Sequence, residues 1–229
     1  MLHSLYQSEV IQSLLDQEQR FDDSHIDSKN RIAVFNLDNT LLMGDIGEAV
    51  LAQLLADGFS LPLTWKEYQR LSKENPGSAY IEVVRSLGEA TMEHIIQVSK
   101  RVLQSKQKFL VCDGEHVRLP KPNVLMQEII RLLRERYYSV FIVSTSNDIS
   151  AKIAGSVLFD VPINNIAGIK WKGLDDTLTS KVLEPISAGI EKVHQYRLMS
   201  GNLKPMIVAT AGETDFPLFS RPPALVASS

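Results

Sequence analysis

The chain has 229 residues, of which 44% are hydrophobic and 22% charged, and its formal net charge is −3. This length and composition suit one large globular domain, or a core with an insertion, and they exclude a disordered chain. The charge offers no basic surface for nucleic acid and no apolar run is long enough to span a membrane, so neither is expected as a partner.

The N-terminal segment and the single cysteine bear on location. Residues 1–23 are amphipathic, with hydrophobic side chains at helical spacing, and they predict an N-terminal helix rather than a secretory signal. Cys112 has no second cysteine to pair with, which excludes an internal disulfide. We therefore expect a cytoplasmic protein.

The first half of the chain predicts one buried strand followed by helices. Residues 31–35 form the strand, because they are apolar on both faces, and a helix over 47–56 ends at Asp57-Gly58. No convincing strand lies in residues 60–107. Helical patterns there cover residues 64–73, 78–87 and 91–104. We expect residues 59–120 to form an all-helical insertion.

In the second half, strands and helices alternate. Helices are predicted over 124–136, 148–158 and 186–199, and strands over 140–143, 166–171 and 206–209, with 225–227 as a further short candidate. Such alternation is typical of an α/β fold, a doubly wound parallel sheet, here formed by residues 24–58 and 121–229. Ligands bind beyond the carboxyl ends of such strands, which directs attention to the residues after 35.

Polar residues follow the first strand in the stretch Val-Phe-Asn-Leu-Asp-Asn-Thr-Leu, residues 34–41. This stretch resembles the first motif of the haloacid-dehalogenase (HAD) phosphohydrolases, an apolar strand ending in Asp-x-Asp-x-Thr. Residues 38–49 are similar to the phosphoserine-phosphatase-like branch, including phosphocholine-phosphatase-like proteins. The resemblance implies a HAD-like core with a helical cap, and an ancestral Mg²⁺-dependent hydrolysis of small phosphomonoesters through an aspartyl-phosphate.

The resemblance also assigns roles within this motif. In the family the first Asp is the nucleophile and a metal ligand; here that position is Asn36, whose neutral amide is a poor nucleophile and an uncharged ligand. Asp38 occupies the position of the acid–base residue, whose main-chain carbonyl also binds the metal, and Thr40 the position of a phosphate-binding residue. Without the resemblance, the same residues indicate a strand end followed by an Asx-type turn.

Two further family elements concern phosphate. Ser144 follows the strand at 140–143, at the place of a phosphate-binding hydroxyl, and nearby Ser146 or Asn147 would suit a helix N-cap. Lys192 matches the lysine that neutralises phosphate charge. A lysine on a helix is most often a solvated surface residue, and Lys181 is the reserve candidate for this role.

The fourth family motif is an apolar strand followed by Gly-Asp-x-x-x-Asp, whose acids bind Mg²⁺. In residues 205–218 an ungapped match places Ala211 at the first acid and Asp215 at the last, whereas a shifted match makes Glu213 a ligand. The implied metal ligands are therefore Asp38, Asp215 and Glu213. With Asn36 and Ala211 both uncharged, we expect weak Mg²⁺ binding.

Other candidates belong to the substrate side of the site. Asp45 and Glu48 lie where relatives place acids near a substrate amine, although acids also suit a helix N-terminus. Trp65, Tyr68 and Tyr80 would suit either a cage for a quaternary ammonium group or packing between helices.

The sequence favours a HAD-like relative that has lost most or all phosphomonoesterase activity and binds a small phosphorylated molecule or a protein partner. Two alternatives stay open. The chain is an active phosphatase with a rearranged site that uses Asp38 and Glu213, or an active phosphatase in which Asn36 is an introduced change.

Overall fold

The computed structural model describes residues 31–173 and 178–210 and, for residues 224–226, the backbone. The predicted N-terminal helix over 1–23 lies outside the described residues. So do Ala211, Glu213 and Asp215 of the fourth motif.

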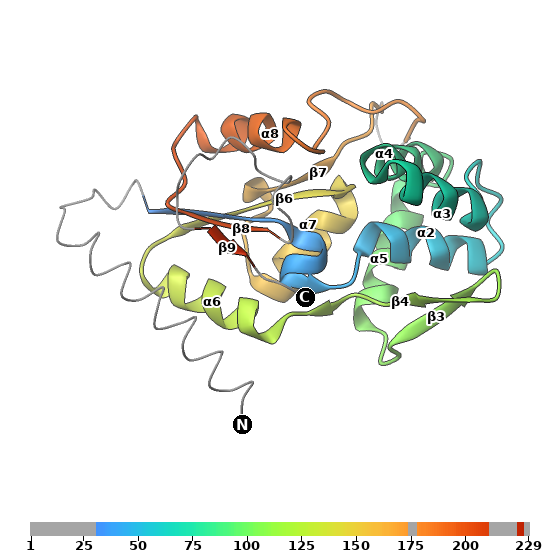
Figure 1. Ribbon diagram of the computed structural model, residues 1–229, viewed down its shortest axis with the longest axis horizontal. Coiled ribbons are helices and arrows are strands. Elements are labelled where there is room, and N and C mark those ends of the chain that lie inside the picture. Colours follow the sequence, from blue (N-terminus) through green and yellow to red (C-terminus); the bar gives the residue numbers. More distant parts are fainter. Residues whose placement is uncertain (1–30, 174–177, 211–223, 227–229) are drawn as a thin grey trace.

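The core is a five-stranded parallel sheet in the order β7-β6-β1-β8-β9 (Figure 1). Its strands are β1 (Ile32–Phe35), β6 (Ser139–Asn147), β7 (Ile166–Ile169), β8 (Ile207–Thr210) and β9 (Ala224–Val226). β1 lies between β6 and β8, which confirms the prediction that these strands are adjacent and parallel. Every residue of β1 is buried, as a central strand with both faces covered requires.

Helices cover both faces of this sheet, so the doubly wound α/β class is confirmed (Figure 1). Alternate residues of β1 enter two separate apolar clusters, because successive side chains of a strand point to opposite faces. One cluster is closed by α8 (Glu191–Ser200), and the other by α6 (Val124–Glu135) and α7 (Asp148–Phe159). A short 3₁₀ turn, Ile163–Asn165, leads into β7.

α8 begins at Glu191, five residues later than the predicted start at 186. Pro185 lacks a backbone N–H, and Gly189 adopts a φ of 53°, which belongs to the left-handed region. This irregular approach places Lys192 in the first turn of α8.

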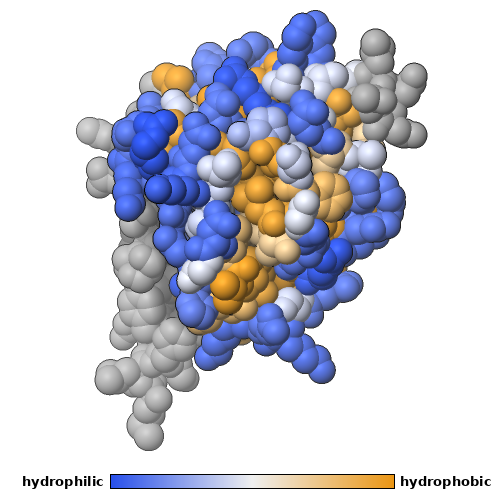
Figure 2. Space-filling model, turned by 90° about the vertical axis from the view of Figure 1, so that its right-hand side faces the viewer, coloured by the Kyte–Doolittle hydropathy of each residue, from blue (hydrophilic) through white to orange (hydrophobic). Residues whose placement is uncertain are grey.

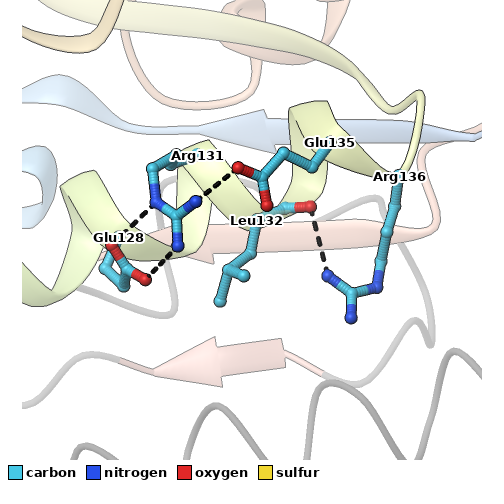
Figure 3. Close-up of polar contacts among 5 residues, drawn as sticks. All are labelled: Glu128, Arg131, Leu132, Glu135 and Arg136. Atoms are coloured by element: carbon cyan, nitrogen blue, oxygen red, sulfur yellow. Dashed lines mark hydrogen bonds and ion pairs between the residues drawn. The ribbon is translucent and has the colours of Figure 1, made fainter.

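The exposed side of α6 carries a small ion-pair group, in which Arg131 contacts both Glu128 and Glu135 (Figure 3). Arg136, just after the helix, donates to the main-chain carbonyl of Leu132. These charged side chains are about half exposed, so they contribute little to stability and mark the solvated face of the helix.

The chain leaves the core sheet through a turn, η2 (Leu37–Leu41), and the short strand β2 (Leu42–Met43). It returns through β5 (Lys121–Pro122), which pairs antiparallel with β2. We call the intervening residues 44–120 the cap segment. Its helices are α2 (Ile46–Ala56), α3 (Trp65–Glu74), α4 (Pro76–Leu87) and α5 (Met92–Gln104). A side-chain N-cap begins each of them, at Asp45, Thr64, Asn75 and Thr91 respectively.

The expectation that residues 59–120 are all helical was wrong at its C-terminal end. There β3 (Phe109–Cys112) and β4 (Glu115–Arg118) form an antiparallel hairpin. The sequence signal is the dipeptide Asp113-Gly114 after the apolar run Phe109–Cys112, because such a dipeptide favours a two-residue hairpin turn. In the structure both residues of the dipeptide take positive φ, 49° and 79°.

α2 joins the cap segment to the core. The sequence placed it within the core segment 24–58, and in the structure it packs against α5, α4 and the hairpin, and also against β6 and α7 (Figure 1). On the side of the molecule that is on the right in Figure 1, hydrophobic side chains gather in the middle of a hydrophilic surface (Figure 2). No helix among the described residues is long and apolar enough to cross a bilayer.

Candidate functional site

The polar residues singled out by the sequence meet at the carboxyl edge of the sheet. Asn36 directly follows β1, where its backbone N–H donates to the carbonyl of Ala209 in β8 at 2.9 Å. Ser144 lies in β6, the neighbour of β1 on the other side, and is fully buried. The predicted convergence of these two residues is confirmed, whereas Ala211 lies outside the described residues.

The Asn36 amide is buried and hydrogen-bonded at both ends. Its Nδ2 donates to the main-chain carbonyl of Asp38 at 2.8 Å and to the Thr40 hydroxyl at 3.4 Å. Its Oδ1 accepts a hydrogen bond from Lys192 Nζ at 3.0 Å. An ammonium group can only donate, so it must face the oxygen of the amide, and this contact fixes the orientation of the side chain. Position 36 is therefore a neutral group held by three neighbours.

Lys192 is placed at the site by the first turn of α8, and its side chain is only 1% exposed. Lysines are almost never buried to this extent without polar partners. The reserve candidate, Lys181, is exposed instead. Of the two lysines, the structure brings Lys192 to Asn36.

Asp38 accepts hydrogen bonds on both carboxylate oxygens. Oδ1 accepts from the backbone N–H of Ile46 at 2.9 Å, and Oδ2 accepts from the hydroxyls of Ser144 at 2.7 Å and Ser146 at 2.9 Å. Burial raises the pKa of Asp38, and these hydrogen bonds together with the charge of Lys192 only partly offset that effect. Asp38 thus ties the end of β6 to the start of α2.

Ser146 is a site residue that the sequence assigned only as an alternative N-cap. In the structure Asn147 is the N-cap of α7 and accepts from the backbone N–H of Ser150 at 2.8 Å. The Ser146 hydroxyl instead donates to Asp38 and accepts from the backbone N–H of Gly47 at 3.0 Å. Its contacts are long-range, and no local pattern in the sequence signals them.

The two acids assigned to the substrate side lie near Asp38, at the start of the cap segment. Asp45 caps α2 by accepting from the backbone N–H of Glu48 at 2.8 Å, and its second oxygen accepts from the Tyr80 hydroxyl at 2.5 Å. Burial and the negative charges of Asp38 and Glu48 raise the pKa of Asp45 well above its usual range. Burial and the charge of Asp38 also raise the pKa of Glu48. These carboxyl groups therefore hold protons more tightly than exposed ones do.

The aromatic residues of the cap segment divide between two roles. The negative charge of Asp45 is the main reason why the pKa of the Tyr80 hydroxyl is raised, whereas burial mainly raises that of Tyr68. Trp65 packs against Tyr68 with ring centroids 5.2 Å apart. Its indole Nε1 is buried and has no hydrogen-bond partner among the described residues. Tyr80 thus contacts Asp45 directly, whereas Trp65 packs against Tyr68.

The oxygen atoms of the described residues do not fit a divalent cation as ligands. The Asn36 Oδ1 faces the Lys192 ammonium, and the Asp38 carbonyl faces an amide hydrogen of Asn36, so both oxygens that the family would offer to Mg²⁺ are engaged by donors. No group of three or more His, Cys, Asp or Glu residues in the described parts of the chain could hold a metal ion. The remaining predicted ligands, Asp215 and Glu213, lie outside those parts.

Comparisons with known proteins identify similar folds but no close relative in sequence. No family model and no curated protein match the chain. A phosphoserine phosphohydrolase-like protein from Francisella tularensis subsp. tularensis SCHU S4 is similar in structure, with a TM-score of 0.56 and 16% identity over 82% of each chain.

Two further solved structures are similar. A substrate-bound phosphoserine phosphatase has a TM-score of 0.52 and 18% identity, over 81% of this chain and 80% of the other. A HAD family hydrolase from Salmonella enterica subsp. enterica serovar Typhi has a TM-score of 0.58 and 14% identity, over 82% of this chain and 59% of the other.

Proposed function

Because the chain has a HAD-like phosphatase fold, we propose that it binds a small phosphomonoester without hydrolysing it through an aspartyl-phosphate. The observation that supports this proposal is the charge, burial and hydrogen bonding of the Asn36 side chain. The residue at the nucleophile position is a neutral amide, buried beside Lys192 and hydrogen-bonded through both of its polar atoms.

The chemistry of Asn36 argues against covalent catalysis. A nucleophile needs an available electron pair, and a carboxylate supplies one with a full negative charge, whereas an amide nitrogen shares its pair with the carbonyl. The Asn36 oxygen already accepts a hydrogen bond from an ammonium group, which lowers its reactivity further. Losing a covalent nucleophile typically slows an enzyme by several orders of magnitude, because positioning and binding supply only part of the rate.

The groups needed to bind a phosphate are retained. At the carboxyl edge of the sheet, the Lys192 ammonium contacts Asn36, and the hydroxyls of Ser144 and Ser146 contact Asp38 next to the N-terminus of α7. Ammonium groups, hydroxyls and backbone N–H groups are the donors that phosphate oxygens bind in proteins. Asp45 and Glu48 would place acids beside the remainder of the ligand. This arrangement supports a phosphomonoester that also carries an amine, such as phosphoserine or phosphocholine.

Two measurements on the unmodified chain test this proposal. Phosphoserine and phosphocholine should show no release of phosphate in the presence of Mg²⁺. Titration with inorganic phosphate should produce saturable shifts in the backbone amide signals of residues 144–147. Robust Mg²⁺-dependent turnover that is lost in Asp38→Ala would show that the chain is an active phosphatase. A dissociation constant on the order of 1 mM already corresponds to weak binding. If the amide signals do not shift at that phosphate concentration, phosphate binding is contradicted and a protein partner is left as the ligand.

A further inference from the structure

We infer that the phosphate site works without a metal, with the Lys192 ammonium supplying the positive charge that a divalent cation would otherwise provide. The inference rests on the proposed function and adds to it the source of the charge that holds the anion. It follows because the oxygen atoms of Asn36 and Asp38 do not suit Mg²⁺ as ligands.

The position of Lys192 is the first argument. Its Nζ lies 3.0 Å from Asn36 Oδ1, and the side chain is almost completely buried. Asn36 carries no negative charge to offset two cations, so a divalent cation at that oxygen would be repelled by the ammonium group, in surroundings where water screens like charges poorly. A carboxylate at position 36 would offset this repulsion, and the neutral amide does not.

The hydrogen bonds around Asn36 are the second argument. Its Nδ2 directs a hydrogen at the main-chain carbonyl of Asp38 at 2.8 Å. A carboxylate at position 36 could not donate this bond, so the amide changes two potential ligands together: it removes a charge and occupies a carbonyl. Mg²⁺ binds through a few oxygen ligands and depends on their charge and open geometry.

The donors near Asp38 are the third argument. Ser144, Ser146 and the backbone N–H of Ile46 all donate toward the Asp38 carboxylate, so this edge of the sheet already holds one anion with donors. Lys192 adds a positive charge near these donors, and a bound oxyanion would compete with the Asp38 carboxylate for their hydrogen bonds. Inorganic phosphate and the phosphate group of a small ester share this chemistry.

The test compares the affinity of inorganic phosphate in EDTA and in excess Mg²⁺, measured by calorimetric titration of the whole chain. We expect the same dissociation constant in both buffers. Lys192→Met keeps much of the side-chain volume and removes the charge, and it should weaken binding by about tenfold or more, the size of a charge-assisted hydrogen bond. Lys181→Met removes an exposed lysine that has no part in the site, and it should leave the affinity unchanged.

A second variant keeps the test decisive if Lys192→Met fails to fold. Asn36→Asp places a carboxylate beside the phosphate, so its affinity in EDTA should fall and should recover when Mg²⁺ is added. Binding by the unmodified chain only in Mg²⁺ would overturn the inference and leave the proposed function standing. Absence of binding in both buffers would instead overturn the proposed function. Equal affinity of Asn36→Asp and the unmodified chain in EDTA would contradict the role given to the neutral amide.

Discussion

Asn36 shows how a single amide changes a whole set of contacts. Its nitrogen donates to the Asp38 carbonyl and to Thr40, while its oxygen accepts from Lys192. A carboxylate could accept from Lys192 and from the Thr40 hydroxyl, but it has no hydrogen to donate to the Asp38 carbonyl. An amide therefore satisfies the hydrogen-bonding groups of all three neighbours in the structure.

The first prediction concerns recovery of catalysis at this position. The double change Asn36→Asp with Ala211→Asp should restore Mg²⁺ binding and some hydrolysis of phosphoserine or phosphocholine. Asn36→Asp alone should restore less, because the family pattern would still lack one charged ligand. Steady-state phosphate release at varied Mg²⁺ measures both. Full activity in the single variant would show that Glu213 serves the metal and that Ala211 was wrongly aligned.

The second prediction concerns the protonation of Asp45. Its folded-state pKa is raised from the ordinary value of 3.8, chiefly by burial and then by the charge of Asp38. The stability that this group contributes is fully present below the unfolded-state pKa and is lost as the pH rises through the folded-state value. Asp45→Asn keeps the acceptor for Glu48 and cannot ionise. Between the unfolded-state and folded-state pKa values the free energy of unfolding should therefore shift in favour of Asp45→Asn as the pH rises, by up to about 1.4 kcal/mol per pH unit.

Urea unfolding of both proteins from about pH 4 to about pH 8 measures this difference. Tyr80→Phe serves as a matched variant, because the Tyr80 hydroxyl donates to Asp45 and lowers its pKa. Its removal should extend the pH-dependent window upward. A difference between Asp45→Asn and the unmodified chain that does not change with pH would contradict the assignment.

At the scale of elements, the start of α2 is the junction between the cap segment and the core. The backbone N–H groups of Ile46 and Gly47 donate to Asp38 and to Ser146, so the first turn of the helix is held by two side chains from the site. The contact is close: a Cβ at Gly47 would lie 2.8 Å from Ser146 Oγ. A glycine at this helical position is explained by that approach and not by helix propensity.

The third prediction follows from this contact. Gly47→Ala should destabilise the protein by about 1–3 kcal/mol, because overpacking against Ser146 outweighs the propensity gain of about 1 kcal/mol. Gly77→Ala is the matched control, since its nearest atom would be Asn75 Oδ1 at 3.5 Å, and it should be neutral or stabilising. Chemical unfolding measures both. Equal stability changes in the two variants would show that the α2 junction is not tightly packed.

At the scale of the whole molecule, cap segment and core are joined by specific hydrogen bonds as well as by apolar packing. Trp171, which follows β7, donates from its indole Nε1 to the carbonyl of Val84 in the last turn of α4 at 2.6 Å. Carbonyls in the last turn of a helix have no partner within the helix, so a side chain from the core supplies one. This contact holds α4 over the side of the sheet that carries the site.

The fourth prediction compares the two tryptophans. Trp171→Phe leaves the Val84 carbonyl buried without its donor and should cost about 1–3 kcal/mol, with faster hydrogen exchange in α4 than elsewhere. Trp65→Phe removes an indole N–H that has no partner among the described residues, so it should cost less for a similar loss of ring area. Hydrogen exchange and unfolding of the two variants provide the measurement. A larger cost for Trp65→Phe would contradict the proposed connection through Val84.

Elements with a local hydrophobic pattern could be predicted from the residues alone. The apolar run at 31–35, the alternation of strands and helices after 121 and the helices at 64–104 follow from hydrophobic periodicity and from capping residues. Asn36 and Ser144 could be placed at one edge of the sheet, because the carboxyl ends of parallel strands lie at the same edge. The hairpin at 109–118 was also signalled locally, by Asp113-Gly114, and was missed.

Contacts between residues distant in sequence could not be predicted in this way. The burial of Lys192 against Asn36, the donation of Ser146 to Asp38 and that of Tyr80 to Asp45 join residues 156, 108 and 35 positions apart. The residue types at these positions suit surface, cap and packing roles equally well, so no local pattern separates these roles. Packing of α8 and of the cap segment against the sheet brings these groups together, and burial then fixes their hydrogen bonds, because an unpaired polar group inside a protein is costly.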